Sequence, residues 1–329
     1  MDIVSNPLVV IIFAFVVILM LALDLGVFNR KSHAISNKEA LIWSIVWISL
    51  SMIFSLFLLS QTNVEKFSQF QSAYWIEKAL SVDNLFVFIL IFGFFKVPKE
   101  LHHKVLFWGI LGALIMRAIF IFSGVELINM TYLPPFELFG KILNVNILLL
   151  LFGIFLVYAG IKSVFVNIEN EEKKDFGKSF GVKLIRKFFP VSDEFHEGKF
   201  IIKKMNVRFA TRLMLVLAVI ESTDLIFAID SIPAIFAIAP DDPFILYMSN
   251  IFAILGLRSL YFLLANFIHM FSKLKYGLAV ILSFIGLKMI FSPIYHIEAT
   301  VSLMILGGVL ILSLVWSILS AKKNENLEF

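Results

Sequence analysis

The sequence predicts an all-α, polytopic bundle of transmembrane helices, and two observations carry that prediction. The chain has 329 residues, of which 60% are hydrophobic and only 16% are charged. Soluble domains carry about 25% charged residues. In addition, several apolar runs exceed the roughly 18 residues that mark a membrane-spanning helix. We therefore expect the core of this protein to pack inside a lipid bilayer.

Hydropathy predicts about nine spans. The first run, which begins within MDIVSNPLVV, lacks a basic leader segment and is long enough to cross, so we expect a span there and not a cleaved signal peptide. The predicted spans lie at about 7–28, 40–60, 73–95, 104–123, 146–166, 210–238, 244–267, 276–292 and 299–319.

Positive charge alternates between successive short loops. It gathers after the first, third and seventh spans and in the C-terminal tail, at Arg30, Lys31, Lys38, Lys96, Lys99, Lys104, Lys273, Lys275, Lys322 and Lys323. The loops after the second, fourth, sixth and eighth spans contain only Lys66 and Lys141. By the positive-inside rule, we expect a multi-pass protein of the inner (plasma) membrane, with its N-terminus outside and its C-terminus in the cytoplasm.

One long polar loop divides the chain. We expect an N-terminal two-helix extension at 1–60, a first transmembrane repeat at 61–166, a cytoplasmic loop at 167–209, a second transmembrane repeat at 210–292 and a C-terminal helix and tail at 293–329. The lysine-rich loop predicts a solvated, partly helical connector that faces anionic lipids, with a regulatory role as the alternative.

Three landmarks recur in the same order on both sides of this loop. Glu77 and Asp83 have the same six-residue separation as Asp224 and Asp230. RAIFIF at 117–122 resembles RSLYFL at 258–263, and GIKSVF at 160–165 resembles GLKMIF at 286–291. A repeat of three spans must insert its two copies in opposite directions. Spans 3–5 and 6–8 therefore predict an inverted repeat, as found in many secondary transporters.

Composition excludes several classes of function. The chain has no cysteine, which rules out disulfides, thiolate metal sites and thiol catalysis within it. The net charge of +4 is explained by loop residues that set topology, so a nucleic-acid partner is not expected. The spans contain no His–Glu zinc motif and no Ser–Lys pair, so we do not expect an enzyme, and no cofactor is required.

Acids inside the spans are the main functional signal. A carboxylate at the centre of a span costs roughly 2.5–3.5 kcal/mol, so five of them facing lipid would cost on the order of 10 kcal/mol. They must face the protein interior. The histidines His33, His102, His103, His196, His269 and His296 all fall in or beside loops. A buried site would then use oxygen ligands only, which suit Mg²⁺, Ca²⁺ and Mn²⁺. The candidate metal ligands are Glu77, Asp83, Asn84, Glu221, Asp224, Asp230 and Ser231.

Structural ion pairs are the alternative explanation for these acids. The candidate partners within or at the ends of spans are Arg117, Arg258, Lys162 and Lys288. Asp24, near the predicted cytoplasmic end of the first span, is either an inner-gate acid or a helix-end residue. Crowded carboxylates repel one another unless a cation or protons neutralise them, which favours an ion site over simple pairing.

Helix geometry limits which acids can share an ion. Side chains six positions apart diverge by roughly 120° on a regular helix. Glu77 and Asp83 would then face different directions unless the backbone breaks. Pro233 follows Asp230 and removes a backbone donor, so we expect a kinked or unwound stretch at AIDSIP.

The chain resembles the TerC/Alx family of integral membrane proteins. The resemblance is carried by LDLGVF at 23–28, EKALSVDNLFVF at 77–88, ESTDLIFAIDSIPAIFAI at 221–238 and DPFILYMSNIFAILGLRSLYFLL at 242–264. It implies a divalent-cation transporter, chiefly for manganese efflux, and places the motif acids of the family on Glu77, Asp83, Asp224 and Asp230, with Asn84 and Glu221 beside them. Some relatives are linked to tellurite resistance.

Two functions are therefore expected from the sequence. The first is export of divalent cations, foremost Mn²⁺, through a carboxylate site between spans 3 and 6, with coupling to proton entry as an extension. The second is a membrane scaffold, assembly or tellurite-resistance factor whose buried acids are structural ion pairs. The expected partners are a divalent metal ion and membrane lipids.

Overall fold

The computed structural model describes residues 7–28, 36–138, 141–165, 175–204, 206–267, 273–295 and 297–325. The predicted site residues Asp24, Asp83 and Asp230 lie in described helices, but their side chains are outside the described part of the structure.

The fold is almost entirely helical, which confirms the predicted class. Its helices are α1 (Pro7–Phe28), α2 (Asn37–Gln61), α3 (Val64–Phe95), α4 (Lys99–Met130), α5 (Ile147–Phe165), η2 (Phe176–Lys178), α7 (Phe180–Phe188), η3 (His196–Gly198), α8 (Arg212–Phe236), α9 (Pro243–Leu255), α10 (Leu257–Phe267), α11 (Leu274–Phe291) and α12 (Ala299–Glu325). Two antiparallel hairpins join them, β1 (Phe136–Leu138) with β2 (Lys141–Leu143) and β3 (Ile201–Lys204) with β4 (Val207–Ala210).

The structure contains enough apolar helix for a multi-pass membrane protein. Within the described ranges, six helices are long and apolar enough to cross a bilayer, and the bent pair of α9 and α10 raises the number to seven. The other two predicted spans correspond to α1, which has a shorter apolar stretch, and to the 25-residue α8, which carries three acids. The total of nine spans stays a prediction.

Side-chain caps determine where the site-bearing helices begin. The Asn63 side chain accepts a hydrogen bond from the Lys66 N–H at 2.9 Å, so α3 begins at Val64, nine residues before the predicted span. α3 ends where Lys96 adopts a left-handed conformation at φ 52°. Thr211 caps α8 in the same way as Asn63, through the Met214 N–H.

The two acid-bearing helices, α3 and α8, lie antiparallel and in contact with one another. Near the beginning of α3, Lys66 forms an ion pair with Asp242, which follows the end of α8. Further along α3, Ser81 and Phe88 line the same cavity as Ile220 and Asp224, which lie in the first half of α8. Glu77 and Asp224, the acids of these helices that contact Arg117, are thus brought to a similar depth.

The next helices of the two halves are also antiparallel. The ring of Phe122 in α4 contacts Phe244 and Tyr247 in α9, while Arg117, one turn earlier, contacts Asn250, one turn later. The two helices therefore cross in opposite directions, as α3 and α8 do.

A reciprocal glycine contact joins α5 to α11. A Cβ on Gly160 would lie 2.8 Å from the Ala279 carbonyl, and a Cβ on Gly286 would lie 2.6 Å from the Gly153 carbonyl. Gly160 and Gly286 are the first residues of GIKSVF and GLKMIF. Their partners also correspond, since Gly153 and Ala279 each lie seven residues before the motif glycine of their own half. Only glycine allows the backbones to approach this closely. Each half of the chain thus supplies the same contact to the other.

Of the kinked or unwound stretch predicted at AIDSIP, the unwound form is wrong, and a kink there stays a prediction. α8 remains helical through Pro233 to Phe236, so AIDSIP is not unwound. The break instead separates α9 from α10 at Gly256, with a bend of 41°. Proline removes one donor, but this does not by itself end a helix that neighbouring helices hold in place.

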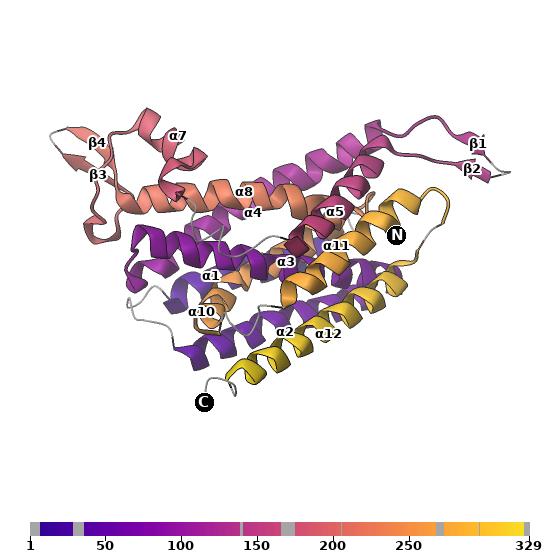
Figure 1. Ribbon diagram of the computed structural model, residues 1–329, viewed down its shortest axis with the longest axis horizontal. Helices are drawn as coiled ribbons and strands as arrows, with labels where there is room; N and C mark the ends of the chain where they lie inside the picture. The colour runs from indigo at the N-terminus through magenta and orange to yellow at the C-terminus, as the bar shows by residue number, and fades with distance from the viewer. Residues whose placement is uncertain are drawn as a thin grey trace.

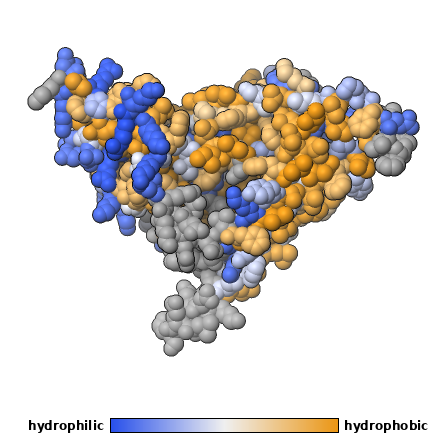
Figure 2. Space-filling view, turned by 45° about the horizontal axis from the view of Figure 1, so that its top comes forward, coloured by the Kyte–Doolittle hydropathy of each residue, from blue (hydrophilic) through white to orange (hydrophobic). Residues whose placement is uncertain are grey.

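The two hairpins and α7 lie at the two ends of the bundle. Along the long axis in Figure 1, the β1–β2 hairpin lies at one end, and α7 with β3 and β4 lies at the other. Figure 2 shows hydrophilic residues gathered over the end that carries α7, with apolar residues over the middle of the face. This distribution matches a bundle whose middle faces lipid and whose ends face water.

Candidate functional site

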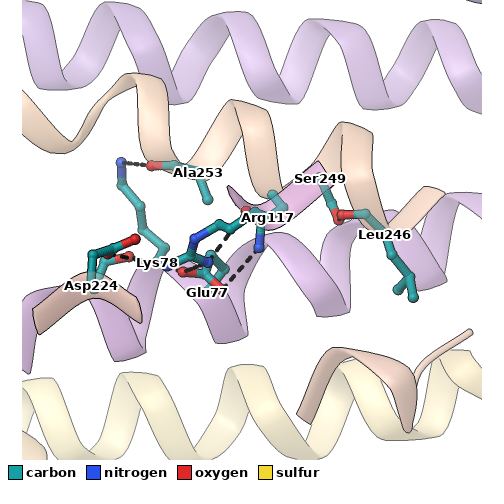
Figure 3. A network of polar contacts seen from close by, with 9 residues as sticks. Glu77, Lys78, Arg117, Asp224, Leu246, Ser249 and Ala253 are labelled. Atoms are coloured by element: carbon teal, nitrogen blue, oxygen red, sulfur yellow. Dashed lines mark hydrogen bonds and ion pairs between the residues drawn. The ribbon is translucent and has the colours of Figure 1, made fainter. Parts of the chain in front are cut away.

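A buried arginine contacts acids on both of the acid-bearing helices, α3 and α8. Arg117 of α4 is 1% exposed, and its Nη1 lies 2.5 Å from Oε1 of Glu77, which is fully buried on α3. Its Nη2 lies 3.7 Å from Oδ1 of Asp224 on α8 (Figure 3). Three helices from both halves of the chain therefore meet at one guanidinium.

A fourth helix completes this network through an amide. Asn250 of α9 donates from Nδ2 to Oε2 of Glu77 at 3.0 Å and accepts from Nη1 of Arg117 at 3.3 Å. Ser81 donates to Oε1 of Glu77 at 3.4 Å. Both oxygens of Glu77 are thus engaged. Asp224 is held less closely, since its distance to Arg117 exceeds hydrogen-bonding range and its side chain is 15% exposed.

A small cavity lies beside this network, with room for about one water-sized sphere. Its polar lining comes from Ser81, Asn84, Asp224, Arg117 and Arg258, and apolar residues of α3, α4, α8, α9 and α10 complete it. Residues from the two predicted repeats therefore line the same space. The oxygens that face it belong to a carboxylate, an amide and a hydroxyl, which are ligand types that hard divalent cations accept.

Glu221 lies one turn before Asp224, against a glycine of α4. The carboxyl group of Glu221 occupies the position that a Cβ on Gly112 would take. Gly112 therefore sets how closely Glu221 can approach α4. Sequence reasoning did not identify Gly112, although an isolated glycine inside an apolar helix is a signal of close approach.

The Gly112→Ala variant is expected to fold and to impair the site. The added methyl displaces the Glu221 carboxyl group, which is the flexible end of a side chain and can turn away. We expect the divalent-cation transport that the sequence predicts to fall by about tenfold or more, because small misplacements at a site are costly. Uptake into vesicles measures this. Gly93→Ala is the matched control, since a Cβ there meets no atom within 4 Å. Equal transport by both variants would contradict the role of Gly112.

A second buried cation, Lys78, holds the helix break. Although it follows Glu77 in sequence, its side chain points to α9, and Nζ donates to the Ala253 carbonyl at 3.2 Å (Figure 3). The last carbonyls of a helix lack partners inside it, and they attract a cation. A Cβ on Gly256 would lie 2.8 Å from this Nζ. Sequence reasoning missed Lys78, because neighbouring residues project about 100° apart and only the packing shows where each one points.

The Gly256→Ala variant is expected to destabilise the bundle. Its Cβ would meet Nζ of Lys78 and, at 3.1 Å, Cβ of Trp47, which cannot move without its backbone. Overpacking of this kind costs about 1–3 kcal/mol. Thermal unfolding of the purified protein measures the loss. Gly307→Ala, which has open space around the new Cβ, should leave stability unchanged or raise it. Unchanged stability of Gly256→Ala would show that the break tolerates a side chain.

The remaining predicted residues are distributed as follows. Ser231 is buried, and its hydroxyl has no hydrogen-bond partner in the described part of the chain. Lys288 donates to Ser302 of α12 at 2.9 Å, and Lys162 lies over the ring of Tyr158 at 5.6 Å. These two lysines thus have contacts of their own outside the network of Arg117. Among the described residues, no group of three or more His, Cys, Asp or Glu side chains is placed to hold a metal ion.

Comparison with known proteins relates the chain to other membrane proteins. The family model described as Integral membrane protein TerC family matches residues 62–325. A relative in Escherichia coli (strain K12), provisionally named membrane-bound redox modulator Alx, is 41% identical over 324 residues, 96% of this chain and 95% of its own length. An uncharacterized membrane protein of Myxococcus xanthus, STKORF319, is 42% identical over 306 residues, 93% of this chain and 90% of its own. No solved structure matches the chain.

Proposed function

Because the chain belongs to the integral membrane protein TerC family, we propose that it exports divalent metal cations, foremost Mn²⁺, across the membrane. One arrangement supports this proposal above all others. Carboxylates from two antiparallel helices, Glu77 and Asp224, face one buried arginine beside a cavity that both halves of the chain line. Ionisable residues at such a place are costly unless they serve an ion pathway or pair with one another.

In this proposal the cation is held by oxygen atoms. Asp224 and Asn84 already face the cavity, and Ser231 is buried on the same helix as Asp224. We expect Asp83 and Asp230, six residues after Glu77 and Asp224, to complete the set, with Glu221 at its edge. A ligand set of carboxylate, amide and hydroxyl oxygens suits Mn²⁺ and disfavours softer metals.

Arg117 acts in this proposal as a resident cation. Its charge neutralises the two carboxylates while no metal is bound. The attraction falls with distance, so the 3.7 Å contact to Asp224 is weaker than the 2.5 Å contact to Glu77. An arriving divalent cation would therefore displace Arg117 from Asp224 first. The pair with Glu77, which Asn250 also holds, would keep Arg117 in the bundle.

Alternating access would follow from an inverted repeat. The antiparallel crossing of α3 with α8 and of α4 with α9, and the reciprocal glycine contact of α5 with α11, support it. Rocking of one repeat against the other would expose the site to each side in turn.

We propose an inner-membrane orientation with the N-terminus outside, and coupling of export to proton entry.

Transport into inside-out vesicles tests the proposal. Uptake of Mn²⁺ is compared with that of Mg²⁺, Ca²⁺ and Zn²⁺, with and without a pH gradient. We expect Mn²⁺ uptake by the natural chain and none by Asp83→Ala or Asp230→Ala, at equal amounts of inserted protein. Full uptake by both variants would remove the proposal, and uptake that ignores the pH gradient would remove proton coupling alone.

A membrane scaffold or stress-resistance factor is the second candidate. The short Glu77–Arg117 pair, fully buried and joined by Asn250, favours it, because structural ion pairs have this geometry. The provisional name of the Escherichia coli relative suggests a redox role, which here would have to act without a thiol, since the chain has no cysteine. The double variant Glu77→Arg with Arg117→Glu exchanges the two charges and keeps the ion pair. If the chain is a scaffold, this variant should keep its function, and if it is a transporter, the variant should lose transport.

A further inference from the structure

The short helix α7 exposes an apolar row that no part of the described chain covers. Phe180, Leu184 and Phe188 are 68%, 44% and 67% exposed. They are four residues apart, so they form one row along the helix. The adjoining side of the helix, with Gly181 and Val182, is buried against the bundle. α7 is therefore held firmly on one side and bare on the next.

A basic row runs beside the apolar one. Lys183 and Lys187 precede Leu184 and Phe188 by one position each, and Arg186 extends the charge around the helix. All three basic side chains are exposed, and α7 contains no acid. Going around the helix axis at 100° per residue, the apolar row lies between the buried side and the basic side. This is the surface pattern of a helix that lies in the headgroup region of a membrane.

Contacts with α3 and α8 place α7 at one end of these long helices. Phe176, which precedes α7, packs edge to face on Phe94, the second-last residue of α3, at 5.6 Å between ring centroids. A Cβ on Gly181 would touch the Ala218 carbonyl, six residues into α8. At 1.5 Å per residue this point is roughly 9 Å along α8. α7 therefore lies beside the last turn of α3 and the first turns of α8, at one end of the bundle.

We propose that α7 is a docking surface for anionic phospholipids of the bilayer in which the chain sits. Phe180, Leu184 and Phe188 insert at the boundary of acyl chains and headgroups, while Lys183, Arg186 and Lys187 bind the phosphate groups. The positive charge of the basic row, and the continuity of the apolar row with the lipid-facing bundle, favour anionic phospholipid over a protein partner. Because Gly181 rests on α8 one turn before Ser222 and Glu221, bound lipid also fixes the helix that carries these residues.

Spin labels test this placement directly, since the chain has no cysteine of its own. Leu184→Cys and Phe188→Cys are labelled with a nitroxide in the full chain, reconstituted in nanodiscs of phosphatidylcholine alone or mixed with phosphatidylglycerol. Val207→Cys on β4, which is 48% exposed, is the matched control away from α7. Accessibility to oxygen and to a nickel chelate gives the depth of each label.

With phosphatidylglycerol, we expect the labels at residues 184 and 188 to be more accessible to oxygen than to the nickel chelate. We expect the reverse for the label at residue 207. Replacing Lys183, Arg186 and Lys187 together by Gln should remove the dependence on phosphatidylglycerol and weaken binding of that lipid by about 100-fold, from about 1 kcal/mol per charge. All the altered side chains are exposed, so the fold should persist, and an unchanged melting temperature verifies this.

Three results would overturn the proposal. The first is that labels at residues 184 and 188 are as accessible to the nickel chelate as the label at residue 207. The second is that these labels insert to the same depth with and without phosphatidylglycerol. The third is that they stay shielded in detergent and broaden one another's spectra, which would identify a second copy of the chain as the occupant.

Discussion

Under the proposed export of Mn²⁺, inside-out vesicles carrying Asp224→Asn will lose Mn²⁺ uptake by at least about tenfold and up to about 100-fold, the range seen when groups that support a metal site are removed. Asparagine has the shape of aspartate without its charge, so packing is retained. The carboxylate it replaces faces the cavity and is held by Arg117 only at 3.7 Å, which leaves it available to an ion. Uptake of the radioactive or fluorescently detected ion measures the loss.

The control for this variant is an acid-to-amide change on the surface. Glu137 lies in β1 and is exposed, so Glu137→Gln should transport as the natural chain does. If Asp224→Asn transports equally well, Asp224 is not part of an ion pathway. In that case its place beside Arg117 is structural.

The Arg117→Met variant will unfold more easily than the natural chain, by about 3–5 kcal/mol, because it leaves a carboxylate buried without its cation. Glu77 is fully buried, and Arg117 is its ion-pair partner at 2.5 Å. Methionine keeps an unbranched apolar stem and a similar volume, so we expect the loss to come chiefly from the missing charge. Thermal or denaturant unfolding of the purified protein measures it.

A double variant separates the ion pair from other effects. Arg117→Met together with Glu77→Gln removes both charges, and we expect it to recover most of the lost stability. Lys66→Met at the surface-proximal pair with Asp242 is the matched control and should cost about 1 kcal/mol or less, since both side chains are partly exposed. Equal stability of Arg117→Met and the natural chain would show that the ion pair with Glu77 does not stabilise the fold.

Much of the architecture could be read from residue types alone. The all-α, multi-pass class follows from long apolar runs, because lipid cannot satisfy backbone polar groups and helices satisfy their own. The resemblance carried by EKALSVDNLFVF and ESTDLIFAIDSIPAIFAI identified the family that the comparison shows. The expected unwinding at AIDSIP was wrong, since α8 continues through Pro233 and the chain breaks at Gly256.

By itself, the sequence determined that the chain spans a membrane and that its acids must avoid lipid, because both conclusions depend only on the transfer of side chains from water to hydrocarbon. Only the tertiary structure decided the partners of each charge. Glu77 and Lys78 are neighbours, yet one pairs with Arg117 and the other caps α9 at Ala253. Their directions depend on which helices pack beside α3, and on glycines such as Gly112 that set how closely those helices approach. Local composition does not contain that information, since contacts between residues far apart in the chain exist only after the bundle has assembled.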